Sequence, residues 1–156
     1  MALEIERKFL VKKGTDIESL STSHVDIGQA YLCADPDHTV RVRVYGEKGY
    51  LTVKTRSRGA VRHEWEYEIP VDDAKTMMTL PGTFSVVKTR YFVPVGIHVW
   101  EVDVFHKHLE GLVTAEIELT AENESFELPS FVDDEVTHDA RYFNSNLSKS
   151  LTIPKL

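Results

Sequence analysis

Charged residues of one sign recur at every second position along this chain. The acidic sets are Glu4 with Glu6, Glu64 with Glu66 and Glu68, Glu101 with Asp103, and Glu116 with Glu118. The basic sets are Arg41 with Arg43, Lys54 with Arg56, and Lys88 with Arg90, and Lys8 follows the first acidic pair. Arginine and lysine suit phosphate oxygens, and a few carboxylates suit Mg²⁺ when substrate phosphates complete its coordination. A metal-bound polyphosphate is one ligand that satisfies both kinds of set.

A spacing of two places each set on one face of a β-strand, because successive side chains in a strand point to opposite faces. Alternation and aromatic or β-branched enrichment predict strands over 2–11, 25–34, 38–45, 49–56, 61–69, 84–93, 97–106 and 112–120. Short links rich in Gly and Pro predict an antiparallel meander that closes or packs as a sandwich. Short helices are predicted over 16–21, 71–80, 122–127 and 139–150. The fold class is therefore mainly β (α+β).

Two interpretations of the charged faces compete. For any one pair, a solvated face of a half-buried sheet is the more frequent arrangement. The whole set favours the second interpretation, in which the sheet curls and the charged faces converge on a lumen. Curling leaves the apolar faces outward, so helices or a partner subunit must cover them, which allows a homodimer.

Length and composition restrict the remaining classes. The 156 residues fit one domain over 1–156, and the net charge of −7 argues against nucleic acid as a partner. No long apolar run predicts a membrane span, and the charged N-terminus is unlike a signal peptide. The one cysteine excludes an internal disulfide and fits the cytoplasm.

The first strand carries the motif ExExK at Glu4, Glu6 and Lys8, and the sets above follow it in a fixed order. With Lys-Thr-Arg at 88–90 and VTHDARYFNSNLS near the C-terminus, this order resembles the CYTH superfamily, the triphosphate tunnel metalloenzymes. The resemblance covers nearly the whole chain. It implies a closed eight-stranded antiparallel β-barrel with a few flanking helices. It also implies chemistry on a small triphosphate with Mg²⁺ or Mn²⁺.

The resemblance also assigns roles to individual residues. The metal positions it implies are Glu4, Glu6, Glu116 and Glu118, with Asp103 and Glu101 near a second metal. The substrate-phosphate positions it implies are Lys8, Arg41, Arg43, Lys54, Lys88, Arg90 and Arg141. The catalytic candidates are Lys8, Tyr31 and a carboxylate, Glu4 or Glu118, that accepts a proton from water. Tyr31 is expected to pair with the first-strand lysine, and a packed strand aromatic is the alternative.

Three functions stay open at this point. The first is a metal-dependent hydrolase of inorganic tripolyphosphate or another small triphosphate. The second is an adenylate cyclase that converts ATP to cyclic AMP and pyrophosphate, and the third is a non-catalytic polyphosphate-binding module. Because Lys88 and Arg41 are expected to face the lumen, we expect that Lys88→Ala and Arg41→Ala weaken turnover while the protein stays folded.

Overall fold

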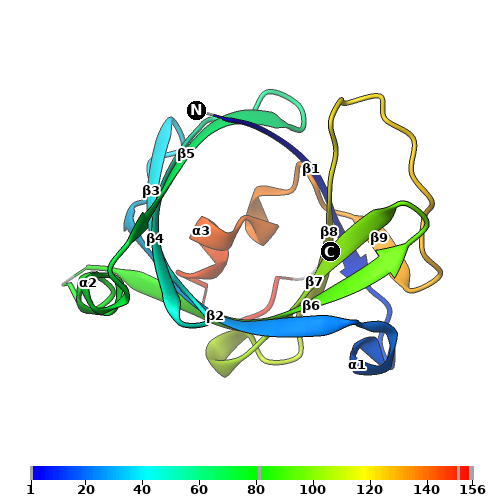
Figure 1. Ribbon diagram of the computed structural model, residues 1–156, viewed down its shortest axis with the longest axis horizontal. Helices are drawn as coiled ribbons and strands as arrows, with labels where there is room; N and C mark the ends of the chain where they lie inside the picture. The colour runs from blue at the N-terminus through cyan, green and yellow to red at the C-terminus, as the bar shows by residue number, and fades with distance from the viewer. Residues whose placement is uncertain (1, 81, 151, 155–156) are drawn as a thin grey trace.

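The charged strands curl into a closed antiparallel barrel in the computed structural model, which describes residues 2–80, 82–150 and 152–154 (Figure 1). The barrel strands are β1 Ala2–Val11, β2 Ser23–Cys33, β3 His38–Tyr45, β4 Lys48–Thr55, β5 Val61–Ile69, β6 Phe84–Val95, β7 His98–Phe105 and β8 Val113–Glu118. They pair in the order β5-β4-β3-β2-β6-β7-β8-β1, and a further β5–β1 pairing closes the ring. The predicted barrel is therefore confirmed.

Strand β1 closes the barrel, and it pairs with other strands along both of its edges. Its first half pairs with β5 over Ala2–Ile5, and β8 occupies the opposite edge over Glu6–Leu10. A ninth strand, β9 Val132–Glu135, pairs with the second half of β1 on the edge that β5 leaves. Strand β9 was not predicted from the sequence. It satisfies backbone groups that would otherwise form an open sheet edge.

Part of the outer wall is covered by helix α2 Val71–Met77, which packs on β3 and β4. Ala74 of α2 joins Ala30 and Val42 of the wall in one buried cluster. Gly49 permits this close packing, because a Cβ there would lie 2.9 Å from the Cβ of Ala74. The predicted helix over 71–80 is thus confirmed in a shorter form.

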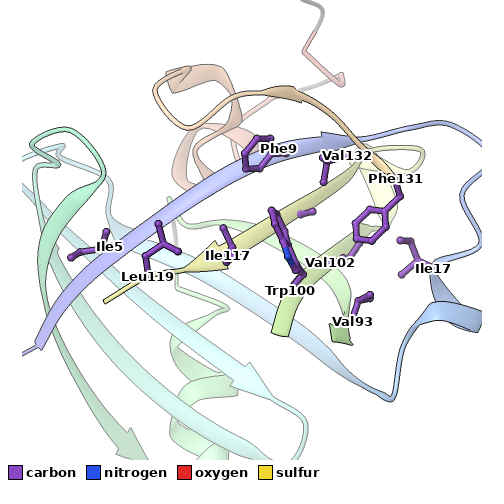
Figure 2. Close-up of a cluster of buried hydrophobic side chains, with 11 residues drawn as sticks. Ile5, Phe9, Ile17, Val93, Trp100, Val102, Ile117, Leu119, Phe131 and Val132 are labelled. Carbon is purple, nitrogen blue, oxygen red and sulfur yellow. The ribbon is translucent and has the colours of Figure 1, made fainter. Parts of the chain in front are cut away.

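The largest apolar cluster covers the outside of β1, β7 and β8 (Figure 2). Trp100 is fully buried there and packs on Phe9, while helix α1 Ile17–Leu20 contributes Ile17. The segment 119–131 covers the rest with Phe126 and Phe131. The helix predicted over 122–127 is wrong, because this segment is a turn followed by irregular chain. Contacts with the outer wall, rather than local helix propensity, set its conformation.

A third cluster fills one end of the lumen. Leu10, Val86 and Phe105 occupy the same strand faces as the tunnel charges, and Tyr142 and Leu147 pack on them. In place of one helix over 139–150, this part holds a 3₁₀ turn, η2 Ala140–Tyr142, and helix α3 Asn144–Leu147. Figure 1 shows α3 within the ring of strands. The C-terminal segment therefore closes one end of the tunnel.

A second 3₁₀ turn, η1 Lys107–Leu109, links β7 to β8. Among the described residues, no helix has the length and apolar character to span a membrane.

Candidate active site

The lumen holds a cavity of about 670 Å³. Most of the predicted site residues line it: Glu4, Glu6, Lys8, Tyr31, Arg41, Arg43, Lys54, Arg90, Glu101, Glu116 and Glu118. They lie on β1 to β4 and β6 to β8, so the even spacing in the sequence places them on the inner face as expected. Thr137, His138 and Asn144 line it from the C-terminal segment.

Two lysines on the tunnel wall contact carboxylates. The Lys54 ammonium lies 2.8 Å from Glu4 Oε2 and 3.2 Å from Glu64 Oε2. The Lys8 ammonium lies 3.3 Å from Glu116 Oε1 and donates to the backbone carbonyl of Tyr142 at 3.0 Å. The C-terminal segment therefore fixes the position of the ExExK lysine.

These pairs hold two carboxylates in their charged form. Burial works against the charge of Glu4, but Lys54 and Arg62 outweigh it and lower its pKa to about 2. Burial also opposes ionisation of Glu116, yet Lys8, Arg90 and Lys88 lower its pKa. Both groups are poor proton acceptors in this arrangement.

Glu6 has the opposite environment. Its carboxyl group is within hydrogen-bonding contact of those of Glu4 and Glu116. Burial and the neighbouring charges of Glu116 and Glu4 raise the pKa of Glu6 well above its ordinary value. Glu118 stands directly opposite Glu6 across the β1–β8 pair, and like charges at such positions repel. Burial, with Glu101, Glu4 and Glu64, raises the pKa of Glu118 as well.

A buried cluster behind the cavity surrounds Asp103. Its carboxylate lies 2.6 Å from the Lys88 ammonium and accepts from Arg90 Nε at 2.8 Å. Arg90 also pairs with Glu101 at 2.8 Å. Burial, together with the charges of Arg90 and Arg43, lowers the pKa of Lys88 to about 7, although Asp103 opposes this.

Two arginines of β3 have different partners. Arg41 lies 3.4 Å from Glu66, and Thr52 bridges the pair by donating to Glu66 at 2.8 Å. Arg43 donates from Nε to Gln29 Oε1 at 2.9 Å. Within the described part of the chain, no carboxylate lies within ion-pair distance of Arg43. Burial and the charges of Arg41 and Arg90 lower the pKa of Arg43 to about 9.

Three predicted site residues lie elsewhere than expected. Of the described residues, Lys88, Asp103 and Arg141 are not among those that line the cavity. Lys88 and Asp103 are fully buried against each other, so their charges are used within the wall. Arg141 lies on the short η2 turn, is exposed and pairs with Asp139 at 2.6 Å.

Tyr31 lines the cavity, but its hydroxyl has a different partner from the one expected. It accepts from Gln29 Nε2 at 3.4 Å, while the Lys8 ammonium contacts Glu116 and the Tyr142 carbonyl. Tyr31 is buried, so it lines the cavity and also packs within its strand.

Besides the polar residues of the C-terminal segment, two polar residues on barrel strands were not predicted from the sequence. Gln29 precedes Tyr31 by two positions, and Arg62 precedes Glu64 by two and lies 3.7 Å from Glu4. Extending the period-two rule by one step along β2 and β5 would have found both. Neither belongs to a pair of like charges at a spacing of two, and such pairs were the pattern that identified candidate site residues.

The donor chemistry of the acidic side fits a hard divalent cation. Burial and the adjacent carboxylates raise the pKa of Glu6, and a divalent cation would offset the repulsion among these groups. In the described ranges, no group of three or more His, Cys, Asp or Glu side chains stands ready to hold a metal ion. Glu4, Glu101 and Glu116 contact basic side chains instead. These acids would therefore exchange basic partners for a cation when a polyanion draws the basic groups away.

A closed antiparallel barrel with both signs of charge facing one cavity defines a protein built to bind a polyanion together with cations. The chain belongs to the CYTH family, because the CYTH domain model matches residues 2–150. It is 47% identical over 151 residues to an inorganic triphosphatase of Acetivibrio thermocellus, covering 96% of each chain.

Two further relatives carry the same name. An inorganic triphosphatase of Nitrosomonas europaea is 37% identical over 155 residues, covering 95% of this chain and 98% of the relative. The crystal structure of an inorganic triphosphatase superposes with a TM-score of 0.68 at 32% identity, covering 99% of each chain. The family predicted from the ExExK motif and the ordered charge sets is confirmed.

Proposed function

We propose that this chain is an inorganic triphosphatase, a divalent-metal-dependent hydrolase of tripolyphosphate or another small triphosphate. The observation that carries this proposal is the division of the cavity lining by charge. Arg41, Arg43 and Arg90 lie on β3 and β6, and carboxylates of raised pKa, Glu6 and Glu118, lie on β1 and β8. The triphosphatase relatives, similar over nearly their whole length, support the same activity.

The basic residues would hold the phosphate chain along the tunnel. Phosphoryl transfer depends on positioning and neutralisation of charge more than on covalent chemistry by the protein. Arg41, Arg43, Lys54 and Arg90 present planar or point charges to the cavity. Lys8 joins them as an ammonium, because Glu116 and Glu6 raise its pKa despite burial.

Glu4, Glu6 and Glu116, with Glu101 on the next strand, would hold Mg²⁺ or Mn²⁺ through their oxygens, which leaves Glu118 outside this set. Bound there, such a cation supplies neutralisation of phosphate oxygens and lowers the pKa of a water. Asp103 is committed to Lys88 and Arg90, so we assign it to orienting Arg90 rather than to a second metal.

Glu118 is a better proton acceptor for the attacking water than Glu4. Its pKa is raised, and in the described part of the chain it has no ion-pair partner, whereas Glu4 is held by Lys54 at a pKa of about 2. A base with a pKa closer to neutrality captures a proton more effectively. We therefore propose Glu118 as the general base and Tyr31 as a wall residue near the phosphates.

A substrate panel tests the proposed function. The pure protein is incubated with tripolyphosphate, ATP or thiamine triphosphate, each with Mg²⁺, with Mn²⁺ and with a chelator, and phosphate, pyrophosphate and cyclic AMP are measured. Metal-dependent phosphate release, fastest from tripolyphosphate, is the expected result. Cyclic AMP formed faster than phosphate from ATP would favour the cyclase, and binding without turnover of any substrate would favour the polyphosphate-binding module.

The oligomeric state and the cellular location of the protein remain predictions. Apolar groups such as Tyr67, which is 62% exposed on the outer face of β5, are compatible with the predicted homodimer. Sedimentation of the pure protein would measure it. The cytoplasmic location is likewise a prediction, which fractionation of the source cells would check.

A further inference from the structure

Gln29 differs from the other groups that contact the tunnel cations. Lys54, Arg41 and Arg90 each contact a carboxylate, whereas the group on Arg43 is a neutral amide. Gln29 is fully buried, and it lies directly opposite Arg43 across the β2–β3 pair. Both ends of its amide are used, since Oε1 accepts from Arg43 and Nε2 donates to Tyr31.

The neutral partner has an electrostatic consequence. A carboxylate at this position would orient the Arg43 guanidinium and also cancel its charge, as Asp103 does for Arg90. An amide oxygen satisfies the Nε–H donor and leaves the full positive charge in a buried setting. Burial and the positive charges of Arg41 and Arg90 lower the pKa of Arg43, as expected for a buried cation whose direct partner is neutral. Arg43 itself lines the cavity, where a polyanion would supply the missing negative charge.

We propose that Gln29 is a positioning residue for triphosphate binding, which holds Arg43 in place without neutralising it and so keeps it as the strongest anion anchor of the tunnel. The proposal rests on the proposed function for the identity of the polyanion. The coupling between Gln29 and Arg43 does not depend on that identity. Gln29 is not among the residues that line the cavity, so its effect on the substrate passes through its two side-chain contacts, Arg43 and Tyr31, and the double-mutant cycle below isolates the Arg43 part.

Two substitutions of Gln29 distinguish the orientation of the Arg43 side chain from the neutralisation of its charge. Gln29→Met removes the acceptor at nearly constant volume, and Gln29→Glu replaces it with a carboxylate that pairs with Arg43. Thr89→Val is the matched control, because Thr89 is also buried and makes two hydrogen bonds, to Asp26 and His106, but it faces the outside of β6. Circular dichroism and thermal unfolding identify variants that fail to fold.

The readouts are the dissociation constant of tripolyphosphate in a chelator, by calorimetry, and KM and kcat with Mg²⁺. We expect Gln29→Met to weaken metal-free binding about tenfold and to raise KM by a similar factor, with kcat little changed. A loss of about tenfold is typical of a hydrogen bond to a charged group. Gln29→Glu should weaken both further, and Thr89→Val should leave both unchanged. The binding measurement stands even if the substrate panel shows no hydrolysis, so the two proposals fail separately.

A double-mutant cycle tests the coupling. In an Arg43→Met background, Gln29→Met should weaken tripolyphosphate binding no further, because no guanidinium remains to be oriented. Equal losses in both backgrounds would overturn the proposal, since they would show that Gln29 only supports the fold. Unchanged binding in Gln29→Met would overturn it as well.

One measurement needs no variant. Gln29 is the single glutamine of the chain, so selective labelling of glutamine side-chain nitrogen gives one amide signal. Metal-free tripolyphosphate should shift that signal, because the ligand pulls on the Arg43 guanidinium that Gln29 holds. A signal that stays unchanged at saturating tripolyphosphate would contradict the proposal.

Discussion

The cations of this tunnel fall into two groups that differ in what surrounds their charge. Lys88 and Arg90 share the buried carboxylate of Asp103, and Lys88 is held inside the wall, away from the cavity. Arg43, equally buried, has the neutral Gln29 as its partner and lines the cavity. Both groups come from the same pattern, a basic pair at a spacing of two on a barrel strand.

The difference separates a stabilising role from a binding role. A buried ion pair is costly to break, because removal of one partner leaves the other charged and buried. A buried cation without a counter-charge is instead a cost to the folded protein that an anionic ligand relieves. We therefore expect substitutions at Lys88 to act on folding and substitutions at Arg43 to act on substrate binding.

The largest effect is expected for Lys88→Ala. It leaves a cavity at a fully buried side chain and removes one of the two cations on Asp103, so the free energy of unfolding should fall by roughly 2–5 kcal/mol. This revises the expectation from sequence that Lys88→Ala stays folded and only loses turnover. Urea unfolding measures the change, with Arg141→Ala as an exposed control that should stay within about 0.5 kcal/mol. A Lys88→Ala protein as stable as the wild type would remove the distinction between the groups.

The next effect concerns Arg43→Met. The dissociation constant of metal-free tripolyphosphate should rise roughly tenfold to hundredfold, because a charged donor to phosphate is lost. The free energy of unfolding should change by less than about 1 kcal/mol, since the charge removed was unpaired. Calorimetry and urea unfolding measure the two quantities. A variant that loses stability but binds normally would reverse the comparison.

Glu66→Gln sharpens the comparison in the other direction. It removes the carboxylate from Arg41 and leaves Thr52 to contact the guanidinium, so Arg41 becomes more like Arg43. Metal-free tripolyphosphate should bind roughly two- to fivefold more tightly, as expected for a partly exposed pair. Calorimetry under the same conditions checks this, and weaker binding would show that Glu66 serves the ligand in another way.

The smallest effect is a pH dependence outside the tunnel. Glu124 accepts hydrogen bonds from Thr120 and contacts His98 at 2.6 Å, and these contacts lower its pKa to about 2. A carboxyl group with a lowered pKa stabilises the fold above its ordinary value of 4.5, and this contribution is lost as the pH falls through about 2. Glu124→Gln should therefore lower the melting temperature slightly at pH 7, with a difference from wild type that vanishes near pH 2. Thermal unfolding across pH measures it, and an equal difference at both pH values would contradict this explanation.

Strand alternation predicted which face each charged residue occupies, but not how deeply it lies along the tunnel. Arg43 and Lys88 both face inward as expected, yet only Arg43 lines the cavity. Depth depends on the tilt of the strands and on the C-terminal segment that fills one end with Tyr142 and Leu147. Neither is a property of a local sequence window.

Segments outside the barrel were predicted less well for a related reason. The acids of 122–127 suggested a helix start, but the hydrogen bonds from Thr120 to Glu124 and the packing of Phe126 hold the segment in irregular form. Strand β9 exists because β1 has a free edge beyond Ile5. Long-range contacts of this kind leave no periodic signal in a single sequence.

Glu6→Gln tests the central claim most directly. The substitution keeps the shape of the side chain but removes the carboxylate that lies between Glu4 and Glu116. Hydrolysis of tripolyphosphate with Mg²⁺ or Mn²⁺ should fall at least about a hundredfold, while metal-free binding of tripolyphosphate stays at the wild-type level or tightens. Metal-dependent hydrolysis by Glu6→Gln at the wild-type rate would contradict the assignment of this acidic side as the metal site of a triphosphatase.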